Sequence, residues 1–182
     1  MSKVYAMIAN GTEEVECLAV VDLLRRARID TTLVSVDGRT IVSSHKINII
    51  ADCTVDEIDL TSADLIFLPG GMPGSEHLAK SAPLISAIDK QLKADKRVAA
   101  ICAAPAVVLG ANGFLRGKKA VCFPGFEDGC VGATVITGAR VVTDGNITTS
   151  RGMGCAIDLG LELIGLLEGK AKAEEIKKSI QY

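Results

Sequence analysis

The sequence has no tryptophan, few other aromatic residues and only two histidines, and each scarcity argues against a class of function. Aromatic residues make up 3% of the chain, which disfavours platforms on which nucleic-acid bases stack. The formal net charge of -2 gives no excess of positive charge for binding nucleic acid or an anionic membrane. Six cysteines occur without a C-x-x-C pair, so zinc has almost no ligand set. The composition predicts no metal, nucleic-acid or membrane partner.

The chain also lacks a long apolar run at its start. The opening MSKVYAMIANGTEE reaches glycine and acidic residues after a short apolar stretch, which is wrongly built for a signal peptide. We expect a cytoplasmic protein with reduced cysteines, most of them small core residues. Its 182 residues suit a single domain over residues 1–182, because domains commonly hold roughly 100 to 200 residues.

Apolar runs rich in valine and isoleucine alternate with stretches of helical period, a pattern typical of a parallel sheet covered on both faces. It predicts an α/β fold with three layers. The expected strands cover 3–9, 31–36, 63–70, 97–101, 119–123, 133–137, 140–144 and 146–150, with a hairpin around His45. The expected helices cover 13–27, 82–95, 103–111, 153–169 and 171–180.

Cys102 stands where the strand at 97–101 turns into a helix. A nucleophile elbow needs small residues two positions to either side, and Ala100 and Ala104 occupy those positions. The N-terminus of a helix favours a thiolate, so we expect a lowered pKa for Cys102. The turn alone also fits a cysteine that is merely a small buried residue of a strand-to-helix loop.

Glu16 lies on an apolar face of its predicted helix, flanked by Val15 and Cys17. Burial of a carboxylate is costly, so the group either pairs, stays protonated with a raised pKa, or extends to solvent. The glycines of LPGGMPG (68–74) follow a strand directly. They permit close approach of backbone N–H groups to a ligand, although glycines in such places are usually turns.

Taken together, NGTEEVE, LPGG and AAICAAP, in this order and spacing, resemble the ThiJ/PfpI superfamily and its Parkinson disease protein 7 and YajL-like deglycase subgroup. The segment TSRGMGCAIDLGLELI (149–164) resembles the closing strand and helix of that subgroup. The resemblance implies a flavodoxin-like three-layer α/β/α sandwich with a mostly parallel sheet, and a homodimer. It further implies that Cys102 is the nucleophile, that Glu16 exchanges a proton with its thiolate, and that the backbone N–H groups of Gly70, Gly71 and Ala103 line an oxyanion pocket.

The activities that the resemblance implies are cofactor-free conversion of methylglyoxal, removal of early glycation adducts from proteins, and a chaperone-like role in oxidative stress. The sequence departs from the family pattern in AVCFPGFEDG (120–129). Family members with a Cys-His pair carry a histidine in this stretch, whereas this chain has Phe123 and no histidine there. That absence argues against peptidase action and against an amidotransferase-like hydrolase.

Two hypotheses remain open. In the first, Cys102 adds to a reactive dicarbonyl or its adduct, and Glu16 moves the proton. In the second, the protein is a redox sensor or holdase whose cysteine is oxidised without turnover. Residues 15–24 are apolar on almost every face, which predicts that the first helix contributes to a dimer interface.

Overall fold

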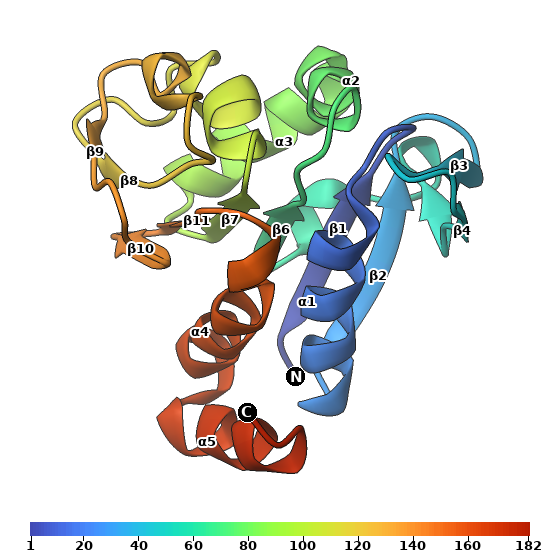
Figure 1. The fold of residues 1–182 in the computed structure, drawn as a ribbon. Helices are drawn as coiled ribbons and strands as arrows, with labels where there is room; N and C mark the ends of the chain where they lie inside the picture. Colours follow the sequence, from blue (N-terminus) through green and yellow to red (C-terminus); the bar gives the residue numbers. More distant parts are fainter.

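A computed structural model describes residues 1–182 and shows a seven-stranded sheet in the order β10-β11-β7-β6-β1-β2-β5 (Figure 1). The parallel strands are β1 (Lys3–Ile8), β2 (Asp30–Ser35), β5 (Cys53–Thr54), β6 (Leu65–Leu68), β7 (Arg97–Ile101) and β11 (Ile147–Ser150). Strand β10 (Val141–Asp144) pairs antiparallel with β11 at one edge. This is the mostly parallel α/β sheet that the sequence predicts.

Helices cover both faces of the sheet, because its central strands are apolar on both sides. The helices are α1 (Glu14–Arg26), α2 (Gly74–Lys80), α3 (Ala82–Lys93), α4 (Ala156–Glu168) and α5 (Lys170–Ser179). Val4, Ala6 and Ile8 of β1 join the core cluster that contains α1 and α4, which lie side by side in Figure 1. Tyr5 and Met7 join the opposite cluster, with residues of α2 and α3. None of the helices combines the length and the apolar character that crossing a bilayer requires.

Most expected elements agree with the structure to within a few residues. The hairpin expected around His45 forms a separate two-stranded sheet of β3 (Thr40–Val42) and β4 (Asn48–Ile50). The strand at 97–101 is β7 as predicted, and β10 and β11 turn at Gly145, whose φ of 63° is left-handed. The expected strands at 119–123 and 133–137 are shorter, and pair only through β8 (Lys119–Ala120) and β9 (Thr134–Val135).

The structure differs from the expected helices in two places. The helix expected over 103–111 is a short π-helix, Pro105–Gly110. At its end the Ala111 N–H donates to the carbonyl of Ala106, five residues earlier, at 3.0 Å. The proline cannot donate, which favours an irregular start to this helix. Helix α2 was not predicted as a full element, since its seven residues are too few to establish a periodic pattern.

Candidate active site

The backbone of Cys102 has the conformation of a nucleophile elbow. Its φ of 65° lies in the left-handed region, which is strained for a residue with a side chain. The Cys102 N–H donates to the Ser150 carbonyl at 3.0 Å, and its own carbonyl accepts the Phe123 N–H at 2.8 Å. Bonds from two separate segments therefore hold this residue in the strained turn at the carboxyl end of β7. The thiol itself is half-buried.

Helix α1 brings Glu16 to the same place. The side chain is 1% exposed, so the possibility that it extends to solvent is excluded. Its Oε2 accepts the Gly70 N–H at 3.0 Å, and the Met153 N–H also bonds the carboxyl group. A side-chain hydrogen bond joins the carboxyl of Glu16 to the thiol of Cys102. The two residues that the sequence singled out are thus direct neighbours.

Two hydrogen bonds, one in each direction, join the start of α1 to the glycine-rich loop 68–74. The Glu13 N–H donates to the Gly70 carbonyl at 2.9 Å, while the Gly70 N–H bonds Glu16. Glu13 also caps the helix, because its Oε2 accepts the Glu16 N–H at 2.6 Å. A Cβ atom at position 70 would meet Oε2 of Glu16 at 2.5 Å and Cβ of Cys102 at 2.6 Å. Only glycine allows the loop to approach the pair this closely.

The predicted backbone donors divide into two sets. The N–H groups of Ala103 and Gly71 both hydrogen-bond the sulfur of Cys102 and lower the pKa of its thiol. The N–H of Gly70 donates to Glu16 and is not free for a substrate oxygen. Gly71 has a φ of 90°, and its Cα faces the backbone of Gly11 and Glu13 with no room for a side chain. All five predicted residues therefore lie together, with Gly70 serving the carboxyl group and Gly71 and Ala103 the sulfur.

The protonation of the pair differs from the sequence-based expectation for Cys102. Burial raises the pKa of Glu16 to about 7. Burial and the negative charge of an ionised Glu16 raise the pKa of the Cys102 thiol to about 12, against the expected lowering. The second cause disappears when Glu16 is protonated, and the hydrogen bond then reverses, because a carboxylic acid donates to a thiolate. The two groups titrate as a coupled pair, and the first proton leaves it near pH 7.

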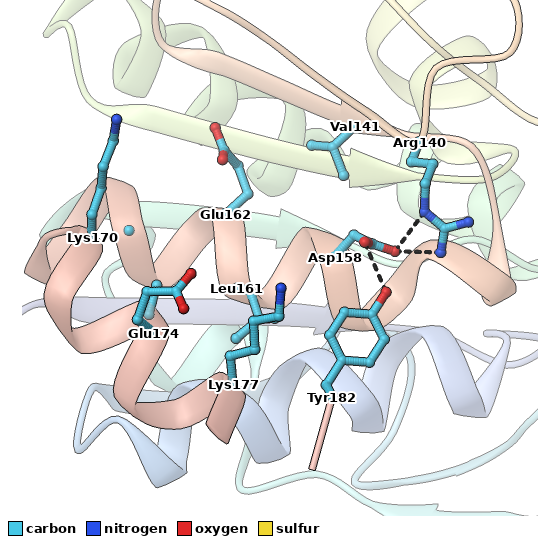
Figure 2. A pocket seen from close by; sticks show the side chains of 11 residues that line it. Arg140, Val141, Asp158, Leu161, Glu162, Lys170, Glu174, Lys177 and Tyr182 are labelled. Atoms are coloured by element: carbon cyan, nitrogen blue, oxygen red, sulfur yellow. Dashed lines mark hydrogen bonds and ion pairs between the residues drawn. The ribbon is translucent and has the colours of Figure 1, made fainter. Parts of the chain in front are cut away.

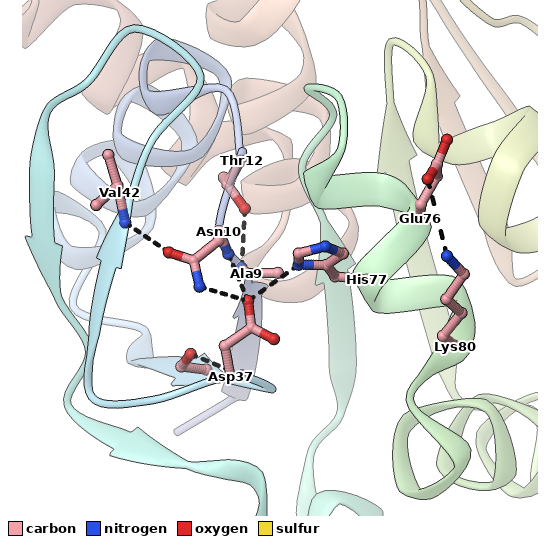
Figure 3. A network of polar contacts seen from close by, with 9 residues as sticks. Ala9, Asn10, Thr12, Asp37, Val42, Glu76, His77 and Lys80 are labelled. Atoms are coloured by element: carbon pink, nitrogen blue, oxygen red, sulfur yellow. Dashed lines mark hydrogen bonds and ion pairs between the residues drawn. The ribbon is translucent and has the colours of Figure 1, made fainter.

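Neither histidine contacts Cys102. The Nδ1 atom of His45 lies 2.9 Å from Oε1 of Glu14. Figure 3 shows that His77 faces Asp37, with 3.1 Å between its Nδ1 and the Oδ2 of that carboxylate. Asp37 also accepts the backbone and side-chain N–H groups of Asn10, at 2.7 and 3.0 Å. This network holds the loop before α1 in place and supplies no base to the thiol.

One group of side chains has the spacing of metal ligands and was not expected from the sequence. Potential ligand atoms of Glu13, Glu14 and His45 lie within 4.8 Å of one another. The contact of Glu14 with His45 and the capping bond of Glu13 account for all three side chains. The group therefore gives no reason to assign a metal.

An apolar groove lies beside the pair. It has a volume of about 430 Å³, and its lining residues include Phe123, Pro124, Arg151 and Met153. Phe123 and Met153 are 45% and 54% exposed, and their backbones bond Cys102 and Glu16 respectively. The groove therefore borders residues that hold Cys102 and Glu16 in place.

A larger hollow, of about 520 Å³, lies away from the pair, between α4, α5 and β10 (Figure 2). Its central polar groups satisfy one another. Asp158 accepts two bonds from Arg140, at 2.6 and 2.9 Å, and one from the Tyr182 hydroxyl at 2.9 Å. We therefore place the candidate site at Cys102 and Glu16, which offer a nucleophile and a proton donor, although the hollow in Figure 2 has the larger volume.

Three contributors to the site escaped sequence reasoning. Ser150 and Met153 hold Cys102 and Glu16 through backbone groups, so their side chains carry no signal of this contact. Glu13 could have been recognised as a helix cap from its position before α1, but its bond to Gly70 joins residues far apart in the chain.

Comparisons with known proteins agree with this geometry. The model of the DJ-1/PfpI family matches residues 2–166. The chain belongs to the DJ-1/PfpI family. Within that family it is 40% identical to DJ-1 homolog B of Arabidopsis thaliana over 173 residues, which is 94% of this chain and 39% of that protein. The chain thus spans about two-fifths of the length of this relative, and 44% of that of DJ-1 homolog A from the same plant.

Other DJ-1/PfpI members match along most of their length. The crystal structure of Drosophila melanogaster DJ-1beta superposes with a TM-score of 0.95 at 32% identity, covering 100% of this chain and 98% of that one. A structure named Toxoplasma gondii DJ-1, oxidized, has a TM-score of 0.93 at 35% identity, covering 100% and 99%. A Pyrococcus horikoshii protein named a deglycase is 32% identical over 82% of this chain and 89% of its own.

Proposed function

We propose that this protein is a cofactor-free, cysteine-dependent enzyme that acts on methylglyoxal-type dicarbonyls or on early glycation adducts of proteins, as part of an oxidative-stress response. The observation that carries the proposal is the direct pairing of Cys102 with a buried Glu16 whose pKa is raised to about 7. A group of that pKa both gives and takes a proton at neutral pH. The deglycase name of one family member supports the same substrate class.

The proposed reaction begins when the pair holds one proton on Glu16 and the negative charge on sulfur. The sulfur bonds to the aldehyde carbon of methylglyoxal, the carbonyl π bond breaks, and its oxygen takes the proton of Glu16. Glu16, now a carboxylate, removes the hydrogen from that carbon, and the electron pair passes to the neighbouring carbonyl to give an enediol. Glu16 returns the proton to the neighbouring carbon, and the hydroxyl proton of the first carbon moves to the oxygen of the second, which gives a lactoyl thioester. Water then cleaves the resulting thioester, releasing lactate and the thiol.

The N–H groups of Gly71 and Ala103 stabilise the sulfur anion before attack. In the proposed reaction the same donors stabilise the carbonyl oxygen as the negative charge passes to it from sulfur. The exposed ring of Phe123 stands at the groove without an acid or base to offer. Glu16 is therefore the only group proposed to move protons.

The assay is lactate formation from methylglyoxal by purified protein. Cys102→Ser is expected to abolish it, whereas Cys53→Ser, which removes another half-buried thiol, is expected to retain it. Iodoacetamide near neutral pH is expected to label Cys102 before Cys53 or Cys130. Lactate formation that survives in Cys102→Ser would exclude the proposed enzyme.

A second function, redox sensing or chaperone-like activity through oxidation of Cys102, is favoured by the relative whose structure is named as oxidized. It predicts rapid oxidation of Cys102 without product formation from dicarbonyls. The same assay separates the two, because a sensor shows Cys102 oxidation and no lactate.

A homodimer is also proposed. Much of the apolar surface of α1 packs against its own chain, but Val15 and Leu18 remain 45% and 39% exposed. The β3–β4 hairpin is bonded to the loop before α1 and exposes Ile47 and Ile50, at 51% and 72%. Exposed apolar side chains gathered in this way favour an interface.

A further inference from the structure

Phe123 presents a fixed aromatic ring to the apolar groove beside Cys102 and Glu16. A Cβ atom at Gly152 would lie 3.2 Å from Cδ2 of this ring, so the ring packs directly on the glycine backbone. The ring of Phe126 meets it edge-on, at an interplanar angle of 81° and with 6.3 Å between the centroids. Phe123 nevertheless remains 45% exposed. The ring is therefore held from two sides and leaves an open surface for a flat apolar ligand.

Both sides of the groove adjoin the backbone of Cys102. One side is formed by residues 123–124, and the other by residues 151–155, the turn that joins β11 to α4. The Phe123 N–H donates to the Cys102 carbonyl at 2.8 Å. The Cys102 N–H donates to the carbonyl of Ser150, the residue before Arg151, at 3.0 Å. The two residues that bond the main chain of Cys102 thus begin or directly precede the two sides of the groove.

The rest of the apolar lining comes from Pro124 and Met153. Met153 is 54% exposed, and its unbranched thioether adapts to the outline of a ligand, unlike the fixed ring of Phe123. The volume of about 430 Å³ is typical of a small-molecule site and is far larger than the methyl group of methylglyoxal. The groove therefore has room for a larger apolar substituent.

The charge of the groove comes from two arginines, and one of them has no counter-ion. Asp158 accepts two bonds from Arg140, at 2.6 and 2.9 Å, and neutralises it. Arg151 is half-buried and has no carboxylate partner, and its one side-chain hydrogen bond, to the Gly138 carbonyl, is long at 3.4 Å. No acidic side chain lines the groove. A free guanidinium beside an apolar surface favours a carboxylate, which matches its planar set of donors.

We infer that this groove is a substrate subsite that selects a flat apolar group ending in a carboxylate. Phe123 and Met153 contact the apolar part, and Arg151 binds the carboxylate. The inference rests on the proposed function, because it names the class of dicarbonyl on which Cys102 acts: α-oxoaldehydes whose second carbonyl carries such a group. The selected group takes no part in bond making, so the steps of the proposed reaction are unchanged.

Protection of Cys102 from alkylation tests the subsite without any need for turnover. The probe is 4-acetylbenzoate, which has the ring and the carboxylate but carries a methyl ketone in place of the aldehyde. Iodoacetamide labelling of Cys102 in the full-length protein, followed by peptide mapping, is expected to slow as the probe saturates the groove. Acetophenone, which lacks the carboxylate, and acetate, which lacks the ring, are each expected to need about tenfold higher concentrations.

Variants assign the protection to the groove. Arg151→Gln and Phe123→Ala are each expected to raise the half-protecting concentration of 4-acetylbenzoate about tenfold. Arg97→Gln is the matched control, because Arg97 is also half-buried and has only a long bond, of 3.5 Å, to the Gly145 carbonyl. It is expected to behave as wild type. The labelling rate without probe shows whether each variant keeps Cys102 in its turn.

Three results would overturn the inference. The probe could fail to protect Cys102 in the wild-type protein. Protection could be the same in wild type and Arg151→Gln, a result that stands even if Phe123→Ala does not fold. Arg97→Gln could weaken protection as much as Arg151→Gln, which would mean that any loss of positive charge has this effect.

Turnover provides an independent measurement. In the wild-type protein kcat/KM is expected to be higher for 4-carboxyphenylglyoxal than for phenylglyoxal or methylglyoxal. Arg151→Gln is expected to reduce this preference about tenfold through KM, and Arg151→Lys, which keeps the charge but loses the planar fork, to give an intermediate value. An unchanged preference in Arg151→Gln contradicts the subsite. If the wild-type protein forms no product from any of the three compounds, the proposed function fails, while the protection experiment still decides the subsite.

Discussion

The Oε2 atom of Glu16 accepts the Gly70 N–H at 3.0 Å, and this bond connects the first turn of α1 to the glycine loop that follows β6. It places a buried carboxyl group against the sulfur of Cys102 and leaves the group only partly compensated, since its pKa is raised to about 7. The raised pKa of Glu16 and its contact with Cys102 therefore depend on the hydrogen bond that joins α1 to the loop after β6.

The first prediction concerns where the negative charge of the pair resides. The proposed reaction requires that the proton which leaves the pair near pH 7 is that of the Cys102 thiol, and that Glu16 holds the remaining proton and donates it to sulfur. Glu16→Ala removes that donor, so the thiol pKa is expected to rise above the wild-type midpoint. Glu16→Gln keeps a donor and is expected to hold the pKa below that of the alanine variant while losing turnover. Absorbance near 240 nm measures the titrations, against Cys102→Ser as a blank.

The opposite sign is equally informative. If alanine lowers the thiol pKa, Glu16 is the ionised member of the wild-type pair and its charge suppresses the thiolate. In that case the proposed nucleophile is not formed near neutral pH.

A second prediction links the same carboxyl group to stability. The first proton leaves the folded pair near pH 7, whereas a free carboxyl group has a pKa of 4.5, so the folded protein binds this proton more tightly than the unfolded chain. The stabilisation is complete below pH 4.5 and is lost as the pH rises through about 7. Each pKa unit corresponds to roughly 1.4 kcal/mol, so the total is about 3 kcal/mol.

Denaturant unfolding of wild type and Glu16→Gln at a series of pH values measures this effect. The difference in unfolding free energy between the two proteins is expected to fall across that interval and then level off. A difference that is independent of pH would mean that Glu16 has an ordinary pKa in the folded protein.

A third prediction tests the close approach at Gly70. Gly70→Ala inserts a Cβ atom 2.5 Å from Oε2 of Glu16 and 2.6 Å from Cβ of Cys102. Overpacking of this kind costs roughly 1–3 kcal/mol, and we expect destabilisation in that range together with slower alkylation of Cys102. Gly38→Ala is the matched control, because nothing lies within 4 Å of its Cβ position. Similar effects of both substitutions would contradict the packing argument.

Much of the fold could be predicted because it follows from local patterns. The apolar runs of β1 and β7 and the helical period of α1 and α3 are each visible within a single window of sequence. Helix α2 was missed because it begins next to Pro73 and Gly74 and lasts only seven residues. The helix after Cys102 was predicted, but its π-helical character was not, because hydrogen bonds five residues apart leave no distinct period in so short a run.

The candidate site was predictable where side chains mattered. Cys102 and Glu16 were recognisable as a thiol at a turn and a carboxyl group on an apolar face. The direction of the Cys102 pKa was wrong because the helix N-terminus was considered without the burial and the neighbouring charge that oppose it.

A fourth prediction follows from the strained elbow. A side chain at a φ of 65° costs roughly 1–2 kcal/mol that glycine avoids, although glycine also stabilises the unfolded chain. We therefore expect Cys102→Gly to be more stable than Cys102→Ala by roughly 0.5 to 1 kcal/mol. Position 104, where φ is -61°, supplies the control, since Ala104→Gly is expected to be destabilising. Urea unfolding compares the three variants, and an alanine variant at least as stable as glycine at position 102 would argue that the turn relaxes.

The last prediction concerns the proposed dimer. Light scattering at micromolar concentration is expected to give twice the chain mass of 19.0 kDa. A double substitution of Val15→Glu and Leu18→Glu puts two charges on the exposed face of α1 and is expected to give monomers, because unpaired charges in an apolar interface are costly. Val131→Glu is the control, since Val131 is 48% exposed and far along the chain from α1. A wild-type mass near 19.0 kDa would remove the dimer, and dissociation by Val131→Glu alone would move the interface from α1 to the 121–135 region.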